Sequence, residues 1–485
     1  MQMIIKRWIC RASELVQYRQ ALIQGTHKDH KLPESLDGSD LEIKEFPNLV
    51  KLYWDKPQIH DPQTWQSLAS LGEDLIKNSP WSSLDTLQAF SQTNYGDKLY
   101  LIAEPYVLQQ LESCDQDLFV NYAKIFWKRF KGGSDFYNTV ANRTFKLKNE
   151  LHLENIYWLV RILWTANYSK PNLYQAMAKK ALSNLGKATD SQLVSLVQAF
   201  IPLGQLTNFI EKSKGEINRR LSSLSLIHRS RLLRYLGKEP DYESLKPLIV
   251  SICDDIVSAD SREIANLCDI MGHYRWLSEY LKPALTECIV KNRSQLRNPK
   301  DIMLILNSYH ELDDSKAVVS DLLPGILASI NDFQPKELGL IVYILGIAEV
   351  KTDDLWEVCK QKFKLYYKNA DSHVISLFAF GFYKVGKFDE EIFNCASGRV
   401  MELGELSSKA LWKLITACRI YPKSDFFWEL REAFKLAYEK YDVNKALVYI
   451  DIFIRAEQVD KELLAIFEKL KARLPKPSTQ EEAKV

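Results

Sequence analysis

The stretch TDSQLVSLVQAF at residues 189–200 places Leu193, Leu196 and Ala199 at intervals of three residues. Residues three apart lie along one side of an α-helix, so this spacing predicts a helix with an apolar stripe. Thr189, followed by Asp190 and Ser191, supplies the polar side chains that favour a helix start. A helix of this kind must bury its stripe against other helices.

The middle residue of that stripe belongs to a series of eleven apolar positions, here called anchors, that recur every 35–38 residues. The anchors are Leu87, Tyr122, Leu159, Leu196, Leu232, Leu267, Ile305, Ile341, Leu377, Leu414 and Ile450. Most residues three positions before and after an anchor are apolar too, and Arg229 is the basic exception. Repeats of this length are helical hairpins that bury their apolar faces against neighbouring hairpins. The sequence therefore predicts an all-α fold, an α-solenoid of about eleven helical-hairpin repeats of 35–38 residues.

A further apolar column lies fourteen residues after the anchors and marks the expected second helix of each hairpin. Its members are Leu101, Phe136, Leu173, Ile210, Leu281, Val319, Leu355, Trp428 and Leu464. Lys246 and Glu391 interrupt this column. We expect the apolar members to be buried.

The ends of the chain differ in composition from the repeats. Segments 47–54 and 65–75 suggest a degenerate hairpin that caps the first repeat. The sequence divides into a basic N-terminal segment at 1–24, an irregular extension with this capping hairpin at 25–80, solenoid repeats at 81–474 and a flexible tail at 475–485.

The N-terminal segment is basic and amphipathic. Lys6, Arg7, Arg11 and Arg19 are opposed by one acid, Glu14, before residue 21. This composition is typical of a mitochondrial presequence and predicts a location in the mitochondrial matrix. The alternative is the basic first helix of a cytosolic protein.

Motifs of catalysis, metal binding and membrane insertion are missing from the sequence. It contains no phosphate-binding loop, dinucleotide fingerprint, zinc-binding helix or nucleophile elbow. We therefore expect a protein that is not an enzyme, with no cofactor and no metal site. His27 and His30 lack cysteine partners nearby and are interpreted as residues of a solvated loop. The eight cysteines form no C-x-x-C pair and are interpreted as buried small side chains in a reducing compartment. The longest apolar run, 338–348, is too short to span a membrane.

Basic residues cluster although the net charge is only +2. Residues 217–238 contain no acid and six cations: Arg219, Arg220, Arg229, Arg231, Arg234 and Lys238. A second stretch, opposed by Asp135 alone, contains Lys128, Arg129, Lys131, Arg143, Lys146 and Lys148. These twelve side chains are the candidates for contact with RNA phosphates. For the acid-free stretch, an acidic protein partner and plain solvation remain alternatives.

The repeats resemble a known family. The phrases TDSQLVSLVQAF at 189–200 and QPKELGLI at 334–341 are similar to heptatricopeptide-type repeats. Such repeats occur in organellar RNA-associated proteins, often ahead of a RAP domain, and the resemblance covers about residues 80–475. This sequence contains no RAP domain, and its repeats lack the fixed polar positions with which pentatricopeptide proteins read single bases. The resemblance thus implies association with organellar RNA but assigns no base-reading residue.

Charge and resemblance together predict a structural component of a mitochondrial ribonucleoprotein, most simply a lineage-specific mitoribosomal protein. It would contact the ribosomal RNA backbone and neighbouring proteins. An organellar RNA stability or processing factor is a variant of this prediction. The alternative from another class is a protein-only scaffold or assembly factor, for example of a respiratory complex.

Overall fold

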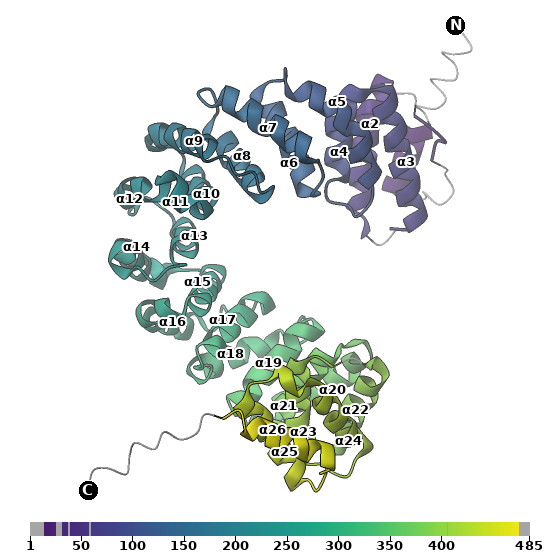
Figure 1. Cartoon of the computed structure of the whole chain (residues 1–485), viewed down its shortest axis with the longest axis vertical. Coiled ribbons are helices and arrows are strands. Elements are labelled where there is room, and N and C mark those ends of the chain that lie inside the picture. Colours follow the sequence, from purple (N-terminus) through teal and green to yellow (C-terminus); the bar gives the residue numbers. More distant parts are fainter. Residues whose placement is uncertain (1–13, 26–31, 37–38, 58–59, 405, 475–485) are drawn as a thin grey trace. The chain divides into compact units, whose positions relative to one another are not determined.

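The computed structural model describes residues 14–25, 32–36, 39–57, 60–404 and 406–474. Within these ranges every regular element is a helix and no strand occurs (Figure 1). The described part contains no helix with the length and apolarity needed to cross a membrane. The chain forms two compact units, Met1–Leu224 and Ser225–Val485. The all-α prediction is confirmed.

Helices in the first unit follow one another as hairpins. They are α2 (Asp40–Trp54), α3 (Pro62–Asn78), α4 (Ser83–Phe90), α5 (Asp97–Leu111), α6 (Gln116–Lys128), α7 (Ser134–Leu147), α8 (Leu153–Thr165), α9 (Pro171–Asn184), α10 (Asp190–Phe200), the short α11 (Gly204–Thr207) and α12 (Phe209–Arg220). A helical segment at 14–24 precedes them. From α4 onward these helices make four hairpins, the last of which carries α11 as an insertion.

The second unit continues the pattern with seven hairpins. Its helices are α13 (Leu226–Leu236), α14 (Tyr242–Asp255), α15 (Ser261–His273), α16 (Ser278–Asn292), α17 (Pro299–Glu311), α18 (Lys316–Ala328), α19 (Pro335–Ile347), α20 (Asp353–Tyr366), α21 (Ser372–Lys384), α22 (Glu390–Leu403), α23 (Ser408–Cys418), α24 (Asp425–Ala437), α25 (Val443–Arg455) and α26 (Lys461–Lys471). Within each unit, first helices pack on the next first helix, as α6 does on α8 and α19 on α21. Second helices pack likewise, as α5 does on α7 and α16 on α18. This is the arrangement of a helical-repeat solenoid.

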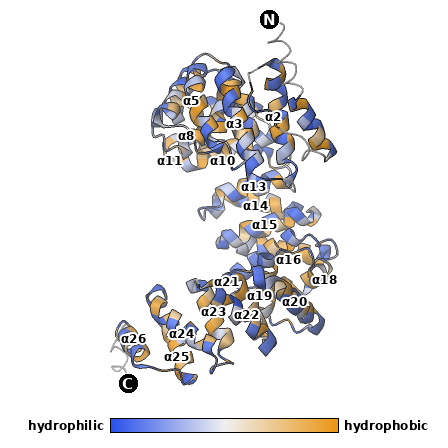
Figure 2. Cartoon of the chain, turned by 90° about the vertical axis from the view of Figure 1, so that its right-hand side faces the viewer, coloured by the Kyte–Doolittle hydropathy of each residue, from blue (hydrophilic) through white to orange (hydrophobic). Residues whose placement is uncertain are grey.

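The anchors form the core, as the sequence predicts. All eleven are at most 5% exposed. Figure 2 shows the amphipathic pattern behind this burial, with hydrophobic and hydrophilic residues on different sides of individual helices.

The column of the second helices is wrong at both ends of the repeat array and at α12. Leu101, Trp428 and Leu464 are exposed and Ile210 is half-buried, whereas the preceding residues Tyr100, Phe427, Leu463 and Phe209 are buried. Where Lys246 and Glu391 interrupt the column, Leu245 and Ile392 are buried in their place. The buried position of the second helix therefore varies by one residue in either direction between hairpins, even where the turns have equal length, as between α19 and α20 and between α21 and α22.

Many first helices end in the same left-handed turn. Two residues after six of these helices, φ lies between 51° and 74°, at Phe130, Asn167, Asp313, Glu349, Gly386 and Glu457. The residue that follows donates its N–H five residues back, as Val350 does to the Leu345 carbonyl at 3.1 Å. This is a Schellman closure, which satisfies carbonyl groups at the helix end.

The packing of α19 on α21 is close because two glycines face each other. A Cβ atom at Gly346 would lie 2.6 Å from the Gly381 Cα atom, and one at Gly381 would lie 2.5 Å from the Val342 carbonyl oxygen. The backbones thus approach as only glycine allows.

The N-terminal extension is more regular than the sequence predicts. Most of 25–80 consists of α2 and α3, which pack together ahead of α4. Ser39 forms a capping box with Glu42, and the Asp61 carboxylate caps α3. Pro47 lies inside α2 rather than in a turn. The presequence prediction rests mainly on residues 1–13, and these, His27, His30 and the tail at 475–485 lie outside the described residues.

Candidate nucleic-acid interface

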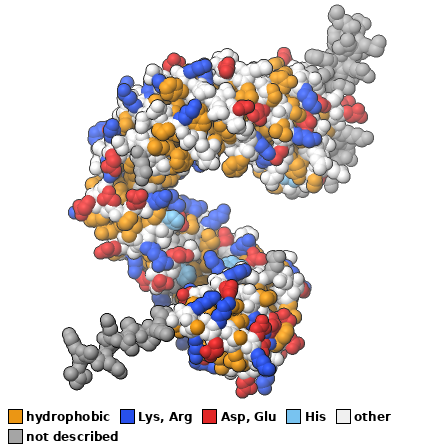
Figure 3. All heavy atoms as spheres, viewed as in Figure 1, with side chains coloured by type: hydrophobic (Ala, Val, Ile, Leu, Met, Phe, Trp, Pro, Cys, Tyr) orange, Lys and Arg blue, Asp and Glu red, His pale blue; other side chains and the backbone are white. Residues whose placement is uncertain are grey.

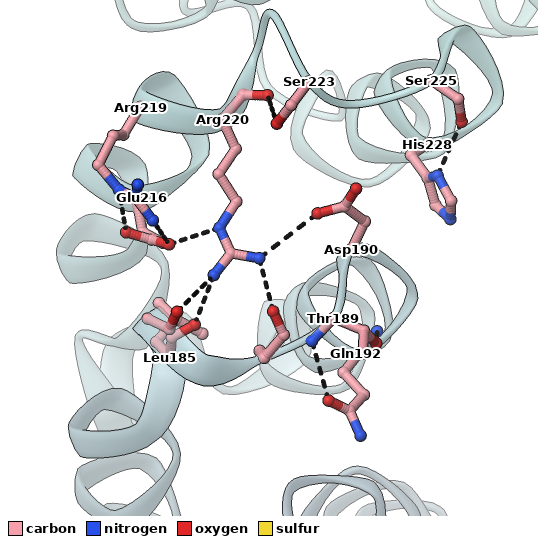
Figure 4. Close-up of polar contacts among 12 residues, drawn as sticks. Leu185, Thr189, Asp190, Gln192, Glu216, Arg219, Arg220, Ser223, Ser225 and His228 are labelled. Carbon is pink, nitrogen blue, oxygen red and sulfur yellow. Dashed lines mark hydrogen bonds and ion pairs between the residues drawn. The ribbon is translucent and has the colours of Figure 1, made fainter.

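Arg220, at the end of α12, is enclosed by its own unit. Its guanidinium donates to the carbonyl oxygens of Leu185, Gly186 and Ala188 at 3.0, 3.1 and 2.6 Å (Figure 4). It also bonds Glu216 at 2.5 Å and lies 3.4 Å from an Asp190 oxygen. Arg220 is only 9% exposed, so it joins α12 to the turn before α10 and is not available to a phosphate.

Arg219 shares the same acid. It donates to both Glu216 oxygens, at 2.9 and 2.6 Å, while most of its side chain remains in solvent. The hydrogen bond from Arg219, helped by Arg220, lowers the pKa of Glu216 to about 2. The charge of this part of the acid-free stretch is therefore offset by an acid just before it.

The Glu216 carboxylate makes the free energy of unfolding depend on pH. A carboxyl whose pKa is lowered in the folded state stabilises that state above its ordinary pKa, and the contribution disappears as pH falls towards the folded value. We expect Glu216→Gln to destabilise the protein at pH 7, and the difference from the wild type to shrink between about pH 5 and pH 2. Urea unfolding at a series of pH values measures this difference.

The control is Glu211→Gln on the same helix, because Glu211 is 70% exposed and forms an ion pair with Lys214, three residues away. Its effect should be small at every pH. A Glu216→Gln difference that stays constant down to pH 2 would contradict the ion-pair assignment.

In the second unit, Arg229 is buried as well. It is 5% exposed, its guanidinium donates to the Ser251 carbonyl at 2.5 Å, and it forms an ion pair with Asp255. Arg234 forms an ion pair with Asp269. Arg231 and Lys238 are exposed and have no ion pair among the residues described. Arg229 is thus wrong as an RNA candidate: it occupies a core column, where burial requires an internal acid.

Two of the six cations of the second basic stretch are also paired internally. Arg129 and Lys131 bind the Asp97 carboxylate at 2.6 and 2.9 Å, and Arg129 also donates to the Thr93 carbonyl. Hydrogen bonds from Lys131 and Arg129 lower the pKa of Asp97. These two cations therefore connect α6 and the turn after it to the start of α5.

The remaining cations of this stretch lie apart from that pair. Lys128 lines a separate cavity beside α2 and α4, and Lys148 lies over the Phe145 ring at 3.8 Å. Arg143 and Lys146 line another cavity together with Lys170. Lys170 is not among the candidates predicted from the sequence. Figure 3 shows acidic and basic side chains interspersed over the visible face of each unit.

We call the cavity around Arg143 and Lys146 the α7–α9 groove. It has a volume of about 630 Å³ and lies between α7 and the start of α9. Its lining consists of Glu112, Thr139, Ala141, Asn142, Arg143, Phe145, Lys146, Tyr168, Ser169, Lys170, Pro171, Asn172 and Leu173. Three cations and one acid give it a positive balance.

Local structure positions these cations. Arg143 donates to the Cys114 carbonyl at 3.2 Å, which holds its guanidinium beside the groove, and its Nε is buried without a partner. Lys170 is the N-cap of α9, whose first residue is Pro171. The helix dipole adds partial positive charge at that end. Phe145 and Tyr168 bring aromatic rings, and Lys170 lies over the Tyr168 ring at 5.4 Å. This combination suits a phosphate next to a base or ribose.

Sequence reasoning finds Arg143 and Lys146 but not their companions. Lys170 and Tyr168 stand outside the basic stretches, and the groove exists only because α7 packs on α9. The signal in the sequence is Lys170 directly before Pro171, since proline at the first helical position marks the helix start.

All seven described cysteines are free. Four of them are buried, whereas Cys114, Cys253 and Cys395 are half-buried, and burial raises the pKa of Cys359 to about 12. Among residues with described positions, no group of His, Cys, Asp and Glu side chains is suited to hold a metal. Comparison with protein-family models and with curated proteins finds no match to this chain.

Proposed function

We propose that this protein is a non-enzymatic helical-repeat scaffold in a mitochondrial ribonucleoprotein, such as the mitoribosome, and that it contacts RNA phosphates through the α7–α9 groove. The supporting observation is the convergence of Arg143, Lys146 and Lys170 at the start of α9, with one acid in the lining. The resemblance of the repeats to organellar RNA-associated proteins and the basic N-terminal segment support the cellular setting.

The groove favours the RNA backbone over base sequence. Lysine and arginine bind phosphates without reading bases, and the rings of Phe145 and Tyr168 accept any base face. We therefore expect RNA binding that is nearly independent of sequence and weakens with salt.

A protein-only scaffold is the second candidate, and the internal ion pairs favour it. Arg220, Arg229 and Arg234 are paired with acids of the same chain, which removes much of the charge on which the RNA prediction depended. The two candidates differ in whether the groove binds RNA.

Reversing the charges in the groove distinguishes the RNA-contacting scaffold from the protein-only scaffold. The triple variant Arg143→Glu, Lys146→Glu and Lys170→Glu should weaken binding of a labelled 20-nucleotide RNA by at least about tenfold at low salt. The log–log slope of affinity against salt should fall by about 2, since single strands contribute roughly 0.7 per phosphate contact. Fluorescence anisotropy with two unrelated RNA sequences measures both quantities.

The control reverses three exposed cations outside the groove, Lys98, Lys179 and Lys187. Both variants change the net charge equally, so only loss confined to the groove variant supports the proposal. Equal binding by both variants would contradict it. If the wild type binds no RNA at low salt and enters an RNA-free complex in its own mitochondria, the protein-only scaffold is correct.

A further inference from the structure

Lys413 in α23 is a buried cation of the second unit with no acid beside it. It is 6% exposed, and its ammonium donates to the Lys409 carbonyl at 3.1 Å. No ion pair joins it to a carboxylate in the described part of the chain. An ammonium has three donors, so this single bond leaves two of them for another acceptor.

Lys435 and Arg431 in the same unit have the carboxylate partners that Lys413 lacks among the described residues. The Lys435 side chain is equally buried, and Asp460, Glu432 and Glu462 surround it at 2.7–3.0 Å. Arg431 is paired with Glu432 and Asp460. Buried charges are normally paired, because an isolated ion loses its hydration without compensation.

The surroundings of Lys413 are aromatic and basic. Its ammonium lies 5.2 Å from the Tyr343 ring centroid on α19 and 4.8 Å from that of Trp412 on its own helix. Burial lowers the pKa of His373 on α21 and of His310 on α17, and the Lys413 charge lowers both further, against the opposite effect of Asp371 on His373 and of Glu311 and Asp313 on His310. Burial, together with the charge of Lys409, lowers the pKa of Lys413 to about 8. At pH 7 the side chain therefore remains mostly charged, without an internal counter-ion.

An approaching ligand would meet more cations nearby. Lys384, Lys409 and Arg419 are exposed on α21, on α23 or just after α23, and the exposed His373 on α21 is neutral at pH 7. The rings of Tyr343 and Trp412 are partly exposed beside them and offer apolar contact. The nearby cations thus attract acidic chains, and the buried ammonium selects an anion small enough to reach it.

We propose that this site binds an acidic segment of a partner protein, and that one Asp or Glu carboxylate of the segment pairs with Lys413. A carboxylate at the end of a side chain can enter a nearly closed site, whereas a phosphodiester carries a ribose on each side. The segment would lie along the first helices α19, α21 and α23. This interaction is separate from the α7–α9 groove and gives the scaffold a protein contact in its second unit.

Two matched substitutions test whether Lys413 lacks a counter-ion. Lys413→Met removes an unpaired ammonium and should raise the melting temperature by a few degrees at pH 7. Lys435→Met removes a cation that three carboxylates share, of which only Glu432 and Asp460 still contact Arg431, and should lower it. A Lys413→Met variant that melts below the wild type would show that the ammonium stabilises the fold itself, and would overturn the proposal.

Binding is tested with the full chain and a fluorescent acetyl-hexaglutamate amide. The wild type should bind this peptide, Lys413→Met should lose at least about tenfold in affinity, and wild-type affinity should fall between pH 7 and pH 9 as Lys413 loses its proton. Equal binding by the wild type and Lys413→Met would overturn the proposal. Displacement of the peptide from the groove triple variant by the 20-nucleotide RNA would also overturn it, because the ligand would then be a phosphate. Failure of RNA binding at the groove leaves this test unaffected.

Discussion

Replacing Arg220 by Ala is expected to lower the free energy of unfolding by about 3–5 kcal/mol, the range seen when one partner of a buried ion pair is removed. The substitution leaves three backbone carbonyl oxygens without their donor, those of Leu185, Gly186 and Ala188. It also removes a connection between α12 and the turn before α10. Urea unfolding followed by circular dichroism measures the change.

Arg219→Ala is the matched control, because both arginines bind Glu216 but the Arg219 side chain is 63% exposed and that of Arg220 only 10%. An exposed pair contributes less than about 1 kcal/mol, so the two neighbours should differ severalfold. Equal effects would mean that Arg220 does not hold the fold together and is free for an external partner.

The second large effect is expected in the core of the second unit. Leu377→Ala should lower the free energy of unfolding by about 2–5 kcal/mol, because it leaves a cavity at an anchor. Leu377 is 5% exposed in α21, which packs on both α19 and α23. Chemical unfolding measures the loss, and the helical signal before the transition shows whether the variant folds.

Leu436→Ala provides the comparison, since Leu436 is 90% exposed on α24. Its effect should stay within about 0.5 kcal/mol. A Leu377→Ala variant as stable as Leu436→Ala would contradict the assignment of the anchors to the core.

The first helices could be predicted well because burial repeats there with a fixed helical spacing. Every anchor is buried, and the stripe around Leu196 has the expected geometry. The second helices were predicted less well, since their buried position moves by one residue between hairpins, as from Trp428 to Phe427. Sequence columns of fixed offset cannot follow such a shift.

The charge clusters were misleading for a different reason. Residues 217–238 contain no acid, but Asp190 reaches Arg220 from 30 residues away and Asp269 reaches Arg234 from 35 residues away. Asp190 and Arg220 meet because they lie at the two ends of one hairpin, formed by α10 and α12, whereas Asp269 in α15 reaches Arg234 in α13 because successive hairpins stack. A stretch of sequence therefore shows the cations but not the acids that pair with them in the fold. Two of the three cations of the α7–α9 groove could be predicted from the sequence, whereas Lys170 lies beside them only because the helices pack together.

The left-handed closures of the first helices have a consequence for engineering. Five of the six closing residues carry side chains, Phe130, Asn167, Asp313, Glu349 and Glu457, although glycine adopts this backbone with less strain. Glycine at each of these positions recovers a fraction of a kilocalorie to about 1 kcal/mol. Because repeats contact only their neighbours, such gains add with little interference. Substitutions in these turns could therefore raise the melting temperature of the natural chain without changing any residue on a helix face.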